Sequence, residues 1–147
     1  MKIVARNKRA RRDYDLGERL EAGLVLTGSE VKALRMGRAN ITDGYVRIKD
    51  GEAWLMGCQI QRYPYATHVS HDPGRPRKLL LHKRQIRKLA GKVSQQGMTI
   101  IPLALYFNDR GLAKVELAVA KGRKIHDKRE AIRRRQQQRE MARALKR

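Results

Sequence analysis

One short segment of the sequence has residue types that could hold a metal ion or move protons. His68, His71 and Asp72 are spaced so that two imidazoles and a carboxylate could meet, and zinc takes such ligands from proteins. However, prolines flank the segment and no fourth ligand lies nearby in the sequence. The pattern therefore favours an ordinary polar loop, and we expect no metal, no cofactor and no catalytic residue.

The charge of the chain indicates the class of its partner. The formal net charge is +21; residues 121–147 hold twelve basic and three acidic residues (net +9), and residues 1–120 hold 23 and 11 (net +12). Because the body is basic as well as the tail, we expect the folded part also to meet phosphate. The tail has too thin an apolar stripe for a helix on a membrane surface. Nucleic acid is therefore the expected partner, and a membrane is not.

Three further titratable residues have alternative interpretations. Glu30 falls in the first turn of a predicted helix, where pairing with the helix dipole would explain it. Glu21 falls in a predicted strand and either pairs with a basic side chain or accepts hydrogen bonds from base amino groups and ribose hydroxyls. His126 is next to Asp127 and could do acid–base work, but a mobile tail holds a catalytic group poorly, so stacking on a base is favoured.

Hydrophobic periodicity and turn residues predict a mainly β chain with flanking helices. Ser29 as N-cap and Gly37 as a stop predict a helix over residues 30–36, and an i, i+3, i+4, i+7 apolar pattern predicts another over residues 82–92. Strands are expected over residues 20–26, 45–49, 53–61, 79–81, 99–107 and 112–120, with a hairpin turn at Asp50-Gly51 and a long exposed loop over residues 63–78 that ends in Arg75, Arg77 and Lys78.

These short strands without strand–helix–strand alternation fit a small OB-like closed antiparallel β-barrel. We divide the chain into a basic N-terminal arm (1–12), the barrel (13–120) and a basic tail (121–147). The tail cannot bury enough apolar surface to order alone, yet helix-forming residues dominate it. We therefore expect it to be disordered when free and helical along a polyanion.

Several features of the whole sequence indicate where the protein acts, which kind of RNA it binds and its oligomeric state. Cys58 is the single cysteine and alternates with apolar residues, so we expect it to be buried. No apolar run approaches a membrane span and the N-terminus does not resemble a signal peptide, which favours the cytosol. Only seven aromatic residues are present, which favours recognition of a folded RNA by shape and backbone. The high net charge argues for a monomer.

Five segments, taken together and in order, resemble the SsrA-binding protein family, also called small protein B. The segments are Asn7-Lys-Arg-Ala10 before Asp13-Tyr14, Glu21-Ala-Gly23, Gly28-Ser-Glu-Val-Lys-Ala-Leu-Arg35 with Gly37, Arg77-Lys-Leu-Leu-Leu-His-Lys83, and Lys121-Gly-Arg-Lys-Ile-His-Asp-Lys-Arg129.

The resemblance implies a function without catalysis. The chain would bind the tRNA-like domain of transfer-messenger RNA and, with elongation factor Tu, deliver it to stalled ribosomes for trans-translation. Its tail would be disordered off the ribosome and would enter the vacant decoding site and the messenger channel of the small subunit as a helix.

The resemblance also assigns residues. Asn7, Glu21 and Leu80 match positions tied to the tRNA-like domain, although periodicity alone places Leu80 in the core. Basic residues of the same segments are expected to contact phosphate, namely Lys8, Lys32, Arg35, Lys78 and Lys83. The tail residues matched to decoding-site engagement are Gly122, Lys124, His126, Asp127, Lys128 and Arg129.

Three rival functions stay open on the residues alone. A basic ribosomal or assembly protein would have the same composition. An RNA-processing enzyme would depend on His68, His71 and Asp72. A membrane-active basic protein is the remaining alternative.

Overall fold

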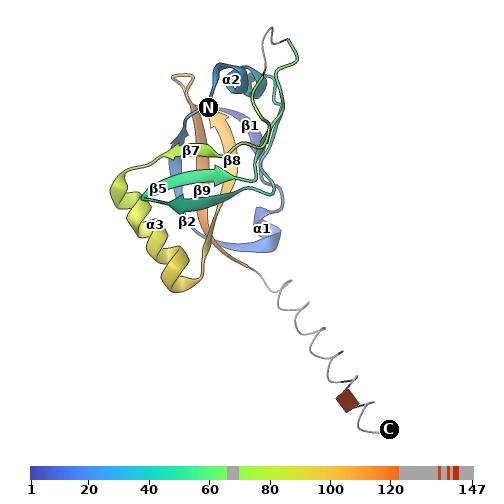
Figure 1. Ribbon diagram of the computed structural model, residues 1–147, viewed down its shortest axis with the longest axis vertical. Coiled ribbons are helices and arrows are strands. Elements are labelled where there is room, and N and C mark those ends of the chain that lie inside the picture. Colours follow the sequence, from blue (N-terminus) through green and yellow to red (C-terminus); the bar gives the residue numbers. More distant parts are fainter. Residues whose placement is uncertain (66–69, 123–135, 137–138, 140, 143–147) are drawn as a thin grey trace.

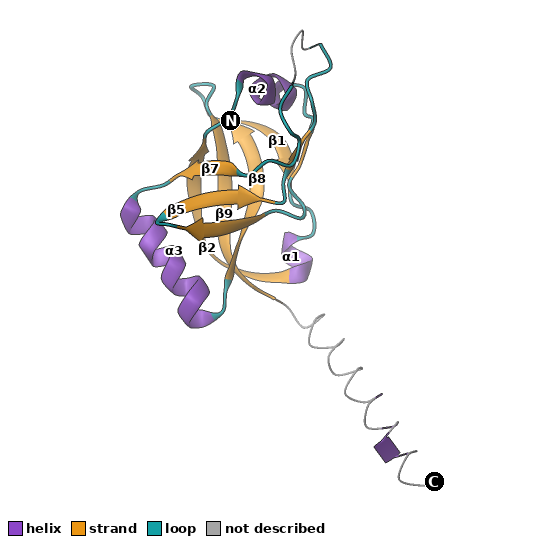
Figure 2. Ribbon diagram, in the orientation of Figure 1, coloured by secondary structure: helices purple, strands orange, loops and turns teal. Residues whose placement is uncertain are grey.

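The computed structural model describes residues 1–65 and 70–122, and four positions of the tail (136, 139, 141 and 142). Within this part of the chain the fold is mainly β, with helices around a strongly curved antiparallel sheet (Figures 1 and 2). The predicted mainly β class with flanking helices is therefore confirmed. The predicted state of the tail lies outside the described residues.

The elements follow one another in a fixed order along the chain. They are β1 (Lys2–Arg6), α1 (Ala10–Asp13), β2 (Tyr14–Leu24), α2 (Gly28–Arg35), β3 (Ala39–Asn40), β4 (Tyr45–Lys49), β5 (Glu52–Met56), β6 (Gln59–Ile60), β7 (Arg77–Leu80), α3 (Lys83–Gln96), β8 (Thr99–Phe107) and β9 (Ala113–Gly122).

A seven-stranded sheet surrounds the hydrophobic core. Its strand order is β1-β8-β9-β2-β7-β5-β4, while β3 and β6 form a separate two-stranded pair. The sheet curls so that β4 also approaches β8. The side chains that the curled sheet encloses are fully buried, among them Ile100, Leu105 and Leu117. The helix α3 connects β7 to β8 and lies along the outside of the strands (Figure 1). None of the helices in the described ranges is long and apolar enough to cross a membrane.

Residues 1–12, expected to be a basic arm, contain a strand that the sequence analysis missed. β1 pairs antiparallel with β8, from Lys2 opposite Phe107 to Arg6 opposite Ala104. Its basic residues are exposed at the two ends, while its middle is partly buried against the core. The edge strand thus belongs to the sheet, and the division of the chain into separate domains stays a prediction.

Two further predictions about local structure are corrected. The N-cap of α2 is Thr27 and not Ser29, because the backbone N–H of Thr27 donates to Glu30 Oε1 (2.9 Å) in a capping box. The strand expected over residues 53–61 is interrupted at Gly57, whose φ is +70° and where a Cβ would lie 2.6 Å from the Asp43 carbonyl oxygen. By contrast, the buried state predicted for Cys58 is confirmed, and burial raises its pKa to about 12.

The loop predicted to be exposed ends in a buried ion pair. Arg77 and Glu30 are 1% and 0% exposed, and Arg77 Nε donates to Glu30 Oε2 over 2.7 Å. The guanidinium also donates to the carbonyl oxygens of Cys58 (3.0 Å) and Pro73 (2.9 Å), and Arg75 forms a second ion pair with Glu30. Glu30 is therefore more than a helix-dipole residue, because it joins α2 to β7.

Opposing influences act on the pKa of Glu30. Burial raises the pKa, but hydrogen bonds from Arg75, from the Thr27 backbone and from Arg77 outweigh it and hold the pKa below its usual range. A lowered folded pKa stabilises the fold above the unfolded pKa of about 4.3. That stabilisation is lost as the pH falls through the folded value.

We predict that Glu30→Gln lowers the free energy of unfolding at pH 7 by about 3 kcal/mol, because Arg77 is left buried without a counter-charge. The matched control Glu52→Gln breaks the half-exposed pair with Lys78 and should cost less than about 1 kcal/mol. Urea titration measures both. The difference between wild type and Glu30→Gln should shrink below about pH 4, and equal costs for the two variants at pH 7 would contradict the central role of the buried pair.

Candidate nucleic-acid interface

Glu21 and Leu80 lie in one surface hollow although they are far apart in the sequence. Leu80 is 55% exposed and lies opposite Gly23 in the β2–β7 ladder. Together with His82, Gln85 and Lys114 among others, these residues line a hollow of about 380 Å³. The periodicity argument that placed Leu80 in the core is therefore wrong, because along β7 the buried positions are Arg77 and Leu79.

Gly23 brings the two strands together at this hollow. A Cβ at position 23 would lie 3.2 Å from Cβ and 3.3 Å from Cδ1 of Leu80, which is tighter than side chains normally pack. Since Glu21 and Gly23 are two residues apart on β2, they face the same side of the sheet. The carboxylate of Glu21 and the apolar side chain of Leu80 are thus presented side by side.

A buried tyrosine holds the carboxylate of Glu21. The Tyr106 hydroxyl donates to Glu21 Oε2, and Tyr106 is 7% exposed. Glu21 Oε1 has no hydrogen-bond partner among the described residues and can accept from a ligand. Of the two roles left open for Glu21, pairing with a basic residue is therefore not what the structure shows.

The two predicted cations of α2 lie over aromatic rings. Lys32 Nζ is 5.4 Å from the centroid of the Tyr63 ring, and Arg35 Cζ is 4.8 Å from that of Phe107. Such cation–π contacts restrain long side chains while the charge stays accessible. Both residues are exposed, so α2 presents two positioned cations to a phosphate backbone.

Asn7 occupies a third location, in the turn between β1 and α1. Its side-chain amide donates to the Pro102 carbonyl (3.0 Å), and its Oδ1 accepts from the backbone N–H of Arg9 (3.2 Å). Asn7 therefore shapes the turn that carries the exposed Lys8. Both residues line a hollow of about 320 Å³ that also includes Arg6, Arg11 and Arg19.

The remaining assigned residues have different surroundings. Lys83 is exposed at the first position of α3, near the Glu21–Leu80 hollow that His82 lines. Lys78 shares the outer face of β7 with Leu80 but lies beside β5, where its Nζ is 3.1 Å from Glu52 Oε1, so its charge is compensated. Gly122 is the last residue of β9, opposite Tyr14, and the other tail residues assigned to the decoding site lie outside the described residues.

Sequence reasoning missed two contributors to the hollow. Tyr106 was counted among the aromatic residues but given no role, and Lys114 was not singled out. Lys114 lies opposite both Gly23 on β2 and Tyr106 on β8. Only strand register could have identified them, because nothing in their local sequence differs from an ordinary strand.

The candidate metal segment has a structural role where it is described. His71 is buried, and its Nε2 lies 2.8 Å from the Ile60 carbonyl oxygen while Nδ1 lies 2.8 Å from Ser29 Oγ. Because a carbonyl only accepts, Nε2 donates to Ile60, while Nδ1 shares a hydrogen bond with the Ser29 hydroxyl. Both nitrogens are thus engaged in holding the loop on α2, while His68 lies outside the described residues.

Comparison with known proteins decides the family. The model of the family described as SmpB protein matches residues 4–147. The chain belongs to the SmpB protein family. This is a family of RNA-binding proteins and not of enzymes, so the predicted resemblance is confirmed.

Individual relatives are similar in sequence to this chain over nearly its whole length. Two proteins named SsrA-binding protein are 55% identical over 144 residues in Acidothermus cellulolyticus and 54% identical over 145 residues in Azorhizobium caulinodans. The alignments cover 98% and 99% of this chain and 90% and 91% of those proteins. A solved structure described as "tmRNA-SmpB: a journey to the center of the bacterial ribosome" is 48% identical, with a TM-score of 0.68, and covers 80% of this chain and 82% of that one.

We predict that the pKa of the Tyr106 phenol reports its hydrogen bond to the Glu21 carboxylate. Burial raises the pKa of Tyr106, and the hydrogen bond and charge of Glu21 raise it further, with a smaller effect of Glu116. In an ultraviolet titration, Glu21→Gln should therefore lower this pKa more than the matched control Glu116→Gln does. Tyr106→Phe identifies the transition, and equal shifts in the two Gln variants would contradict the bond.

Proposed function

We propose that the chain is an RNA-binding adaptor that binds the tRNA-like domain of transfer-messenger RNA and delivers it to stalled ribosomes for trans-translation. The observation that carries the proposal is its likeness to SsrA-binding proteins over 98–99% of its length. The placement of Glu21 and Leu80 in one exposed hollow supports it, because both residues were matched to the same RNA-binding role.

The chemistry of the hollow suits a looped part of an RNA. Unpaired loops present base amino groups and ribose hydroxyls, from which the free oxygen of Glu21 can accept. The exposed Leu80 offers an apolar contact to a base or ribose face. Lys114 and Lys83 lie where they can compensate a nearby phosphate. Tyr106 acts as a positioning residue, since it holds Glu21 without facing the ligand.

The cations of α2 and those around Asn7 would extend the contact along the phosphate backbone. If about five phosphates are neutralised, the affinity should fall with salt with a log–log slope of about −3 to −5. These contacts contribute affinity, and the Glu21–Leu80 hollow contributes selectivity. Two separated basic regions suit a protein that contacts more than one RNA.

The tail would act after RNA binding. It would enter the vacant decoding site and the messenger channel as a helix and contact the RNA of the small subunit, where codon–anticodon pairing is missing. Elongation factor Tu is the expected companion in the delivered complex. The protein would act as a monomer in the cytoplasm, without a cofactor.

We predict that Glu21→Gln weakens binding to the tRNA-like domain about tenfold, because a hydrogen bond to a charged group contributes ~1.5–3 kcal/mol. Glu18→Gln is the matched control, since Glu18 lies on the same strand and pairs with Lys88 at the surface (2.9 Å). Both variants gain one positive charge, so general electrostatics changes equally. Filter binding at ~0.2 M salt tests this, and an equal loss in both variants would exclude a specific role for Glu21.

For the tail we predict a separation of two activities. Changing Asp127, Lys128 and Arg129 together to alanine should leave the affinity for transfer-messenger RNA within about twofold, since one net positive charge is lost from a chain at +21. Peptide tagging on stalled ribosomes should fail in the same variant. A parallel loss of RNA affinity would contradict this division of labour.

A further inference from the structure

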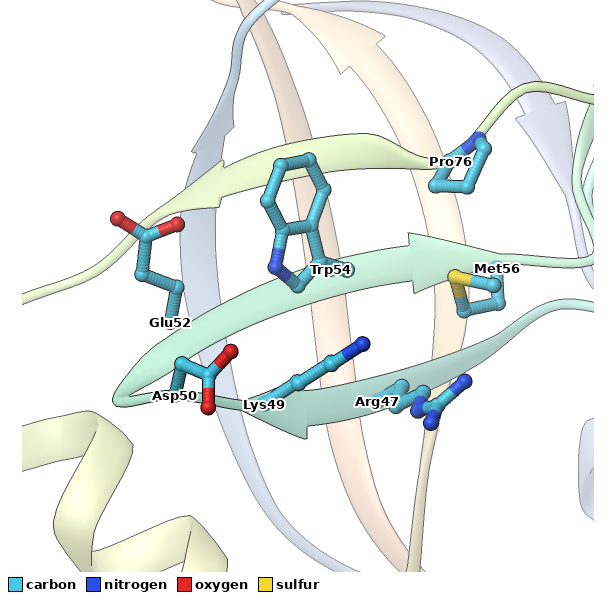
Figure 3. A pocket seen from close by; sticks show the side chains of 7 residues that line it. All are labelled: Arg47, Lys49, Asp50, Glu52, Trp54, Met56 and Pro76. Carbon is cyan, nitrogen blue, oxygen red and sulfur yellow. The ribbon is translucent and has the colours of Figure 1, made fainter.

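A further hollow lies on the outer face of the β4–β5 hairpin and includes none of the residues assigned above. Its volume is about 390 Å³, which is at the small end of ligand-binding pockets (~300–1,000 Å³). Figure 3 shows its lining side chains, which come from both strands of the hairpin, from its turn and from the segment just before β7.

Strand register explains why these side chains gather there. Arg47 lies opposite Trp54, and Lys49 lies opposite Glu52. Alternate residues of a strand share a face, so Met56 lies on the same side as Trp54, while Ala53 and Leu55 are buried in the core. The hairpin therefore presents a polar and aromatic outer face that the core does not require.

The one tryptophan of the chain is placed on this face. Trp54 is half-buried and lies opposite Lys78 in the β5–β7 ladder. Figure 3 shows its indole standing over these strands, with Pro76 and Met56 toward one end of the hollow. A half-buried aromatic ring that lines a surface hollow can serve as a stacking platform for a base.

Charge divides the hollow into two ends. Arg47 and Lys49 form no salt bridge within the described residues, whereas Glu52 is compensated by Lys78 at 3.1 Å. Figure 3 shows Asp50 and Glu52 near the hairpin turn and Arg47 at the opposite end, near Met56. An anion is therefore favoured at the Arg47 end, and a hydrogen-bond donor is favoured at the Asp50 end.

We propose that this hollow binds one unpaired nucleotide of an RNA strand. The base stacks on Trp54, its phosphate lies against Arg47 and Lys49, and an exocyclic amino group of the base faces Asp50. A duplex is excluded because its bases already stack on one another and cannot lie on the indole. The site rests on RNA binding, which the family shows, and not on the proposed role of the Glu21–Leu80 hollow.

Intrinsic fluorescence of the full chain tests the proposal directly, because Trp54 is the sole tryptophan. An eight-nucleotide cytidine oligomer should quench this fluorescence saturably at ~0.2 M salt, and a blunt RNA duplex should not. The uridine oligomer should bind several-fold more weakly, because uracil has a carbonyl group where cytosine has the amino group. Equal quenching by cytidine and uridine would overturn the assigned orientation, and equal quenching by the duplex would overturn the site.

Matched variants separate a built site from general attraction to a polycation. Replacing Arg47 and Lys49 with alanine should lower the affinity for the cytidine oligomer about tenfold. Replacing Lys2 and Arg110, two exposed basic residues that do not line the hollow, removes the same charge and should change affinity less than about threefold. Equal losses in the two double variants would overturn the proposal.

A stacking variant gives an independent check by anisotropy of a labelled oligomer. Trp54→Ala should weaken binding about tenfold, whereas Trp54→Phe should retain most of it. Since neither change touches the Glu21–Leu80 hollow, binding of transfer-messenger RNA through that hollow can succeed while this site fails. Full affinity in a folded Trp54→Ala variant would overturn the stacking role.

Discussion

The buried ion pair between Glu30 and Arg77 is the interaction on which the rest of the structure depends. It joins α2 to β7, and the same guanidinium bonds the carbonyl oxygens of Cys58 and Pro73. The long connection between β6 and β7 is thereby fixed near both ends. Because β7 lies between β2 and β5 in the sheet, its position sets the geometry of the surface on either side.

Side chains alternate between the two faces of the sheet along β7, so the position of this strand also decides which of its residues are exposed. Arg77 and Leu79 point into the core, and Lys78 and Leu80 point outward. Leu80 therefore lies opposite Gly23 in the Glu21–Leu80 hollow, while Lys78 pairs with Glu52 beside Trp54. One strand of four residues thus supports two separate hollows.

Much of this fold follows from sequence, and its failures have physical causes. The bounds of β4 and β8 match their predicted ranges, because the hairpin turn and the long apolar run are strong local signals. β1 was missed because its pairing with β8 is non-local. Arg77 was expected in an exposed loop because prolines and a glycine precede it in the sequence. Leu80 was expected in the core because it lies in an apolar run, and only strand register shows which leucine of the run faces outward. The residues of the site were identified through the family resemblance, whereas the role of Tyr106 could be recognised only in the structure.

In the proposed function, the folded body selects a particular RNA shape while the tail serves another step. The most direct test compares the full chain with residues 1–122, which retain all of β9, for affinity to the tRNA-like domain of transfer-messenger RNA. Ordinary tRNA serves as competitor at ~0.2 M salt. We expect tight, selective binding that the shortened chain retains. Binding that is unselective, or that disappears with the tail, would contradict it and indicate a simple polycation.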